Sequence, residues 1–198
     1  GETRNTETAV ATRTTIDFGI DLGTTNSTVA LVTGTTMDVI PNDQGSALTP
    51  SAVWIDKRGE LRVGSKAKER LEDDPDNAVA EFKLRMGLGP QGAKQFKRSN
   101  RTMLPEELSA EVLKSLRADV LQQKQEDLKA AVITVPAAFD VPECNATQRA
   151  AKLAGLTTAP LLQEPVAAAL AYGFQSVSDK VFWLVYDFGG GTFDAAVV

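Results

Sequence analysis

Two short stretches of this chain share one arrangement of aspartate, glycine and threonine. They are DLGTTNS at 21–27 and DFGGGTFD at 187–194. In each, an apolar, strand-like run ends in an aspartate, a glycine follows two positions later, and a threonine-containing turn leads into a second apolar run. Consecutive backbone N–H groups in a glycine turn can form a concave anion site, and threonine hydroxyls add donors without adding charge. Two such hairpins facing one another indicate a polyphosphate site.

The aspartates at the mouths of these loops, Asp21 and Asp187, predict a cation as well. A carboxylate does not bind phosphate directly, so a positive ion must lie between the two. Mg²⁺ fits best, because it prefers oxygen ligands and usually keeps several waters where it bridges carboxylates and phosphates. The alternative for either loop alone is an ordinary hairpin turn, since glycine and aspartate are common in turns. The repeated layout favours the phosphate site.

Two other phosphate-binding patterns are not supported. Residues 59–66, GELRVGSK, almost match a P-loop, but Ser65 precedes Lys66, which reverses the required order. This stretch is also expected to run through a strand rather than from a strand into a helix, so we interpret the match as chance. No G-x-G-x-x-G pattern opens a helix after a strand, so the sequence does not indicate a dinucleotide-binding fold.

Composition limits the remaining classes of function. The chain has 198 residues, a net charge of −5 and no histidine. The negative charge argues against nucleic acid or an anionic membrane as the main partner. The lack of histidine excludes catalysis by histidine and metal sites with histidine ligands. The single cysteine, Cys144, excludes an internal disulfide and fits a reducing compartment, so we expect a cytoplasmic protein. No apolar run approaches the roughly 20 residues of a membrane span.

The elements that must position these loops are mainly strands at first and then alternate strands and helices. Strands are predicted at 16–21, 27–32, 37–40, 52–56, 60–63, 130–136, 159–163 and 181–187, and helices at 105–127, 140–153 and 164–173. Helical character is also predicted at 64–87, with a break at residues 73–77, DDPDN. In the clearest helix, 105–127, apolar residues repeat every four positions. Asp140 and Glu143 form the sequence pattern of a capping box. This order predicts an α/β fold with a mixed sheet flanked by helices, after a disordered leader at 1–15.

Four motifs together identify a family. GIDLGTTNS, VITVPAAF, LLQEPVAAALAYG and YDFGGGTFD stand in this order. Over residues 16–198 they closely resemble the heat-shock 70 chaperone family of the DnaK type, within the actin and sugar-kinase superfamily. The resemblance implies an actin-like (ribonuclease H-like) fold, the first lobe of a two-lobed ATPase domain, with a smaller inserted subdomain at about 41–128. A sugar kinase or a filament protein would share the two phosphate loops, but would not be expected to carry the EPVAAALAYG helix in this form.

The resemblance also implies a site for ATP or ADP with Mg²⁺. It assigns Asp21, Asp187 and Asp194 to the metal side; Gly23, Thr24, Thr25 and Asn26 to the first phosphate loop; and Gly189, Gly190, Gly191 and Thr192 to the second. The catalytic residues that it implies are Lys83, Glu164, Asp187 and Thr192. Lys83 would contact the γ-phosphate and orient water, although its residue type alone predicts an exposed helix lysine. Glu164 would lie near the metal and the attacking water.

The partners implied for full-length members of the family are unfolded peptides, J-domain co-chaperones and nucleotide exchange factors. Cys144 stands where the family typically has an arginine used in interdomain coupling, and Gln163 where asparagine is usual. We therefore expect altered coupling with intact nucleotide chemistry. Because the resemblance covers one lobe, we expect weak or absent ATP turnover by this chain alone. The alternative is a non-enzymatic module that keeps the fold.

Overall fold

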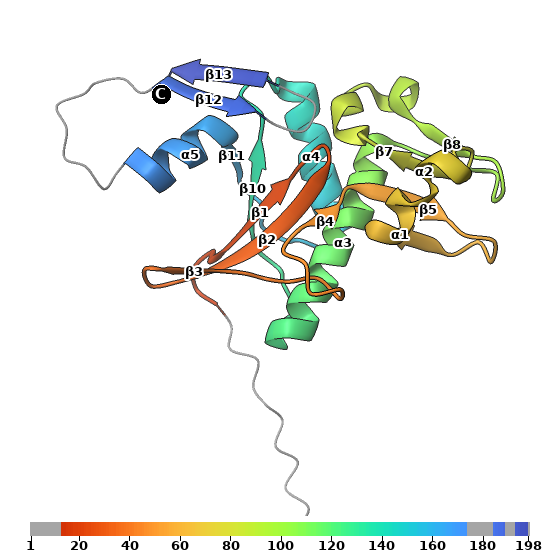
Figure 1. Ribbon diagram of the computed structural model, residues 1–198. Coiled ribbons are helices and arrows are strands. Elements are labelled where there is room, and N and C mark those ends of the chain that lie inside the picture. Colours follow the sequence, from red (N-terminus) through yellow and green to blue (C-terminus); the bar gives the residue numbers. More distant parts are fainter. Residues whose placement is uncertain (1–12, 174–183, 189–192, 198) are drawn as a thin grey trace, which may run out of the picture.

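The computed structural model describes residues 13–173, 184–188 and 193–197, and its centre is a mixed sheet (Figure 1). The strand order is β11-β10-β1-β2-β3, and β4 also pairs with β2. The strands are β1 (Phe18–Leu22), β2 (Asn26–Thr33), β3 (Thr36–Val39), β4 (Thr49–Pro50), β10 (Val132–Val135) and β11 (Leu161–Gln163). β1 runs antiparallel to β2 and parallel to β10, which in turn is parallel to β11. The predicted mixed α/β sheet is confirmed.

One face of this sheet forms much of the hydrophobic core. In β1 the side chains of Phe18, Ile20 and Leu22 are buried, and the register pairs Ile20 with Val29 of β2 and Ile133 of β10, which are buried too. This alternation is typical of a strand with one face packed on the core. In β10 the residues of this face are buried, whereas Val132 and Thr134 on the other face are half-buried.

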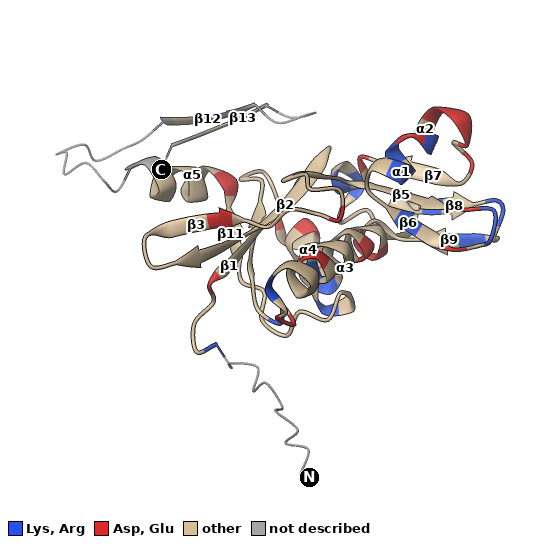
Figure 2. Ribbon diagram, turned by 60° about the horizontal axis from the view of Figure 1, so that its bottom comes forward, with Lys and Arg blue, Asp and Glu red and all other residues tan. Residues whose placement is uncertain are grey.

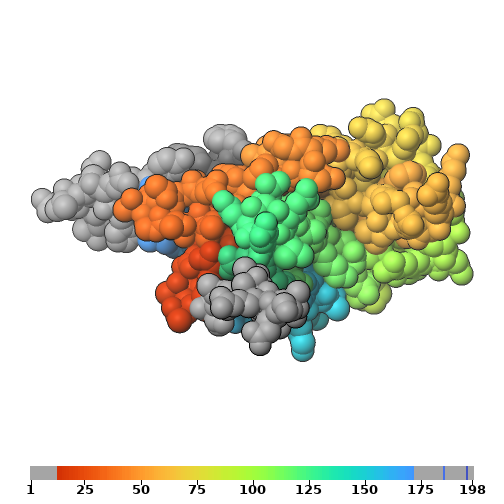
Figure 3. All heavy atoms as spheres, turned by 90° about the horizontal axis from the view of Figure 1, so that it is seen from below, coloured from red at the N-terminus to blue at the C-terminus, as the bar shows by residue number. Residues whose placement is uncertain are grey.

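Two long helices cover the core face. They are α3 (Pro105–Lys124) and α4 (Val141–Leu153), which pack against each other. The predicted stripe of α3 is buried, and the helix stops three residues earlier than expected, because Gln125 adopts a left-handed conformation with φ 54°. α4 begins as predicted, since the backbone N–H of Asp140 donates to the Glu143 carboxylate at 3.1 Å. Seen from below, α3 lies between the N-terminal strands and the region that follows them (Figure 3).

That region, residues 52–103, contains two small sheets. One has the order β6-β5-β7 and the other is the hairpin β8-β9. Its elements are β5 (Ala52–Ile55), β6 (Leu61–Val63), α1 (Ser65–Lys68), α2 (Arg70–Asp73), β7 (Ala78–Ala80), the 3₁₀ turns η1 (Phe82–Arg85) and η2 (Gly89–Gly92), β8 (Lys94–Phe96) and β9 (Arg101–Met103). The helical character predicted for 64–87 was therefore wrong over much of the segment. Pro75 interrupts the helix, and pairing with β5 makes residues 78–80 a strand.

Charged side chains connect the parts of this region. Figure 2 shows acidic residues on α2 and basic residues on the β8–β9 hairpin. Arg98, from the turn of that hairpin, donates to Asp74 at 2.8 Å and to the carbonyl oxygen of Ile55 at 2.7 Å. Trp54 donates to the same Asp74 carboxylate at 2.9 Å. The hairpin is thus joined to β5 and to the end of α2 by polar contacts.

The last described elements are a helix and a hairpin. α5 (Glu164–Gly173) directly follows β11, and β12 (Leu184–Phe188) pairs antiparallel with β13 (Phe193–Val197). α5 contacts β12, and the two lie side by side in Figure 1. The predicted helix at 164–173 is confirmed. Of the strand predicted at 181–187, residues 184–187 are confirmed as strand and residues 181–183 lie outside the described residues, as does most of the expected leader. No helix within the described residues is long and apolar enough to cross a membrane.

Candidate functional site

The turn between β1 and β2 needs glycine at position 23. A Cβ atom added to Gly23 would lie 2.0 Å from the carbonyl oxygen of Asn26, far inside van der Waals contact. The turn therefore folds back more tightly than any side chain would permit. This is the close backbone approach for which glycine is used. A turn at this point was predicted from the DLGTTN pattern, but the approach to the Asn26 carbonyl was not.

Two buried serines, Ser27 and Ser51, hydrogen-bond to the backbone of this turn. The N–H of Gly23 donates to Ser27 Oγ at 3.2 Å, and Ser51 Oγ donates to the Gly23 carbonyl at 2.8 Å. The two serine hydroxyls lie 2.8 Å apart, which closes a ring of hydrogen bonds, and the N–H of Ser51 donates to the Thr25 carbonyl at 2.9 Å. Sequence analysis missed both serines. Ser51 is 28 residues away from the turn in sequence, and its neighbours carry no signal of such a contact.

Asp21 lies on β1 between two threonines of the neighbouring strands. The register pairs it with Thr28 of β2 and with Thr134 of β10. The hydroxyl of Thr134 donates to Asp21 Oδ1 at 3.1 Å. The Asp21 side chain is exposed. A solvent-exposed carboxylate next to a bare glycine turn suits water-mediated contact with Mg²⁺, so the residues present fit this ion.

Lys83 and Glu164, both predicted site residues, are brought together by the fold. Lys83 Nζ lies 2.8 Å from Glu164 Oε1, and the two side chains are 10% and 19% exposed. Lys83 also lies over the ring of Phe139, with Nζ 5.9 Å from the centroid. The residue type alone predicted an exposed lysine, and this was wrong. A lysine is seldom buried without a partner of opposite charge, and Glu164 provides one.

Sheet topology places these features at one edge. β1, β10 and β11 are parallel to one another, so their carboxyl ends point the same way. The glycine turn follows β1, Phe139 comes shortly after β10, and Glu164 directly follows β11. Lys83 joins this edge through Glu164. Ligands of open α/β sheets bind outside the carboxyl ends of the strands, and the predicted residues of the first loop, together with Lys83 and Glu164, gather there.

The second predicted loop, Gly189 to Thr192, lies outside the described residues. Its flanking strands show that Asp187 and Asp194 are directly opposite each other in the β12–β13 ladder. Among the side chains that the structure describes, no three acidic, cysteine or histidine groups converge on a possible metal position. Asp21 is the one metal-side aspartate whose side chain is described.

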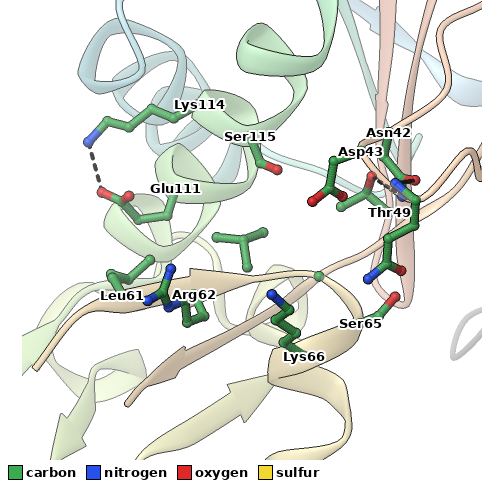
Figure 4. Close-up of a pocket in the computed structure, with 13 residues that line it drawn as sticks. Asn42, Asp43, Thr49, Leu61, Arg62, Ser65, Lys66, Glu111, Lys114 and Ser115 are labelled. Atoms are coloured by element: carbon green, nitrogen blue, oxygen red, sulfur yellow. Dashed lines mark hydrogen bonds and ion pairs between the residues drawn. The ribbon is translucent and has the colours of Figure 1, made fainter. Parts of the chain in front are cut away.

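A polar cavity of about 360 Å³ lies elsewhere, between α3, the start of α1 and the loop before β4 (Figure 4). It is lined in part by Gly64, Ser65 and Lys66 of the near-match to a P-loop. Contrary to expectation, Gly64 does mark a passage from strand to helix, but α1 has only four residues. Lys114, at the rim, is paired with Glu111 at 2.8 Å. None of the predicted site residues that the structure describes lines this cavity.

The topology described above is that of the actin-like fold, with helices on a mixed sheet whose parallel strands end at the candidate site. A family model described as Hsp70 protein matches residues 17–198. The chain therefore belongs to the Hsp70 family, and it corresponds to the amino-terminal lobe of the ATPase domain.

Named relatives agree with this assignment. Proteins named Chaperone protein HscA homolog, from Janthinobacterium sp. (strain Marseille), Herminiimonas arsenicoxydans and Burkholderia cenocepacia (strain HI2424), are 43%, 42% and 41% identical to this chain over 196 residues. Each alignment covers 91% of this chain but only 31–32% of the relative. The chain thus spans about a third of the length of the curated relatives it matches.

Proposed function

We propose that this chain binds the phosphates of ATP or ADP, together with Mg²⁺, at the carboxyl edge of its sheet. The observation that carries the proposal is the convergence there of the Gly23 turn and the mostly buried Lys83–Glu164 pair. Thr24, Thr25 and Asn26 belong to the same turn, and Gly189, Gly190, Gly191 and Thr192 form the second half of the phosphate site by their likeness to the family.

The proposed chemistry is hydrolysis of the terminal phosphoryl group by water. Such a reaction depends mainly on positioning and charge stabilisation. Lys83 donates to an oxygen of the γ-phosphate, and Glu164 holds both the lysine and the attacking water. Asp21, Asp187 and Asp194 would hold the ion, and Thr192 would be the residue beside the γ-phosphate, as the likeness to the family implies. When bound, Mg²⁺ neutralises charge on the phosphate oxygens.

The whole-protein role is inferred from the family. We propose that the nucleotide cycle of this lobe serves ATP-dependent protein folding in the cytoplasm, with unfolded peptides, J-domain co-chaperones and nucleotide exchange factors as partners. Residues from about 41 to 128 form the proposed inserted subdomain. The 198 residues correspond to one of two lobes, and one lobe does not exclude water from the nucleotide. We therefore expect the chain alone to bind nucleotide but to show weak or absent ATP turnover.

Calorimetric titration of the chain with Mg·ADP and Mg·ATP tests the binding proposal. We expect saturable binding that weakens at least about tenfold in Asp21→Ala and in Asp187→Ala, as a charged contact is lost. Asp73→Ala is the matched control, because Asp73 is an exposed aspartate on α2, away from the sheet edge. A folded chain that binds neither nucleotide would overturn the proposal.

A further inference from the structure

We propose that Thr134 is a positioning residue for Asp21. Its hydroxyl holds Oδ1 of the carboxylate and so leaves Oδ2 free to meet the water shell of the ion. This inference rests on the proposed function, in which Asp21 lies on the metal side. The position of Thr134 beside Asp21 becomes apparent only from the strand register.

The geometry distinguishes Thr134 from the other threonine beside Asp21. Thr28 occupies the matching position on β2, but its hydroxyl donates to the carbonyl oxygen of Ala47 at 2.8 Å. Thr134 Oγ1 lies 3.1 Å from Asp21 Oδ1 and 3.5 Å from the carbonyl oxygen of Ile20. The shorter distance makes Asp21 the better acceptor, since hydrogen bonds weaken steeply toward 3.5 Å. Of the two flanking threonines, only Thr134 therefore donates to the carboxylate.

The chemistry of the two side chains suits this role. An aspartate side chain can take three staggered χ1 rotamers and its χ2 torsion is broad, so an exposed Asp21 would sample several orientations if nothing held it. Threonine is branched at Cβ and stiff at χ1, and Thr134 is half-buried within a strand that is paired on both sides. A rigid donor on a rigid strand can therefore fix the carboxylate. Its bond to a charged acceptor is stronger than a bond between neutral groups.

Three variants test the inference: Thr134→Val, Thr134→Ser and the matched control Thr28→Val. The readout is the Mg²⁺ concentration that gives half-maximal ADP binding. We expect Thr134→Val to raise this concentration about three- to tenfold, the loss of one exposed hydrogen bond. Thr134→Ser should restore the wild-type value, and Thr28→Val should leave it unchanged. Equal shifts in Thr134→Val and Thr28→Val, or no shift in either, would overturn the inference.

A second measurement needs no nucleotide and separates this inference from the proposed function. Three-bond NMR couplings report the χ1 rotamer of Asp21 in the ligand-free chain. We expect one rotamer in the wild type and in Thr28→Val, and rotamer averaging in Thr134→Val. Failure of the wild type to bind Mg·ADP would contradict the proposed function, whereas unchanged couplings in Thr134→Val would contradict the positioning role.

Discussion

Lys83 and Glu164 are 81 residues apart, yet they form an ion pair of 2.8 Å in which both side chains are mostly buried. The pair joins η1, within the 52–103 region, to Glu164, the first residue of α5, which directly follows β11. Glu81, two residues before Lys83, is exposed and adopts a left-handed conformation with φ 56°. This turn of the backbone, rare for a non-glycine residue, leads from β7 into η1.

The first prediction concerns stability. Glu164→Gln removes the charge that faces a mostly buried lysine, and should lower the free energy of unfolding by about 1–2 kcal/mol. The double variant Lys83→Met/Glu164→Gln should cost less than the sum of the single changes, because the partners interact. Urea denaturation measures the free energy of unfolding of the two single variants, Glu164→Gln and Lys83→Met, and of the double variant. The control is Lys114→Met: its pair with Glu111 has the same 2.8 Å distance but is more exposed, so we expect a change near zero. Additive effects at Lys83 and Glu164 would contradict the prediction.

The second prediction concerns the chemical step. In a two-lobed ATPase domain that contains this lobe, Lys83→Ala and Asp187→Asn should each lower single-turnover ATP hydrolysis by about 100-fold or more. Lys83→Ala removes the positive charge beside the reacting phosphate, and Asp187→Asn weakens the site of the Mg²⁺ that would neutralise that phosphate. Lys114→Ala should leave the rate unchanged, because Lys114 lines the cavity beside α3 and is not one of the predicted site residues. Wild-type rates in both Lys83→Ala and Asp187→Asn would refute the catalytic assignment of these residues.

The third prediction concerns the phosphate turn. Gly23→Ala places a methyl group 2.0 Å from the Asn26 carbonyl oxygen, so the turn must open. We expect a loss of about 2 kcal/mol or more in stability and loss of nucleotide binding. Gly19→Ala is the matched control on the same strand, where an added Cβ meets no described atom within 4 Å. Nucleotide titration and thermal unfolding of both variants provide the check, and equal behaviour of the two would show that the turn tolerates a side chain.

The fourth prediction concerns pH. Burial, and secondly the nearby Asp43 carboxylate, raise the pKa of Asp119 to about 6, although the backbone N–H of Asp43 acts in the opposite direction. Asp119 is 6% exposed, and its Oδ2 has no hydrogen-bond partner among the residues that the structure describes. An unfolded aspartate has a pKa of about 3.9, so the folded state binds more protons between the two values. The contribution of Asp119 to stability is therefore fully present below about pH 4 and is lost as pH rises through about 6.

Asp119→Asn should remove this loss. Near neutral pH the free energy of unfolding of the variant should exceed that of the wild type by about 2 kcal/mol, and this difference should vanish near pH 4. Urea denaturation at a series of pH values measures it, with the exposed Asp73→Asn as control. A stability difference that does not change with pH would show that Asp119 does not titrate in this range.

Much of the fold could be predicted because its signals are local. The stripe of α3, the capping pair Asp140–Glu143 and the apolar runs of β1 and β2 each lie within a few residues. Prediction failed where a partner distant in sequence decides the conformation or the burial of a residue. Residues 78–80 have no strong strand pattern, and they form β7 because β5 offers a pairing edge. Lys83 was expected to be exposed because nothing beside it in sequence neutralises its charge.

The sequence by itself determined the family and the two aspartate–glycine hairpins, whereas the need for glycine at position 23 follows from the folded turn. Only the tertiary structure decided which side chains support them. Ser51 reaches Gly23 across 28 residues, Glu164 reaches Lys83 across 81, and Thr134 reaches Asp21 across 113. The last of these contacts depends on the parallel pairing of β1 with β10, which joins distant segments through a long crossover and has no local turn to set its register. Such contacts depend on the folded sheet, so no local pattern in the sequence could reveal them.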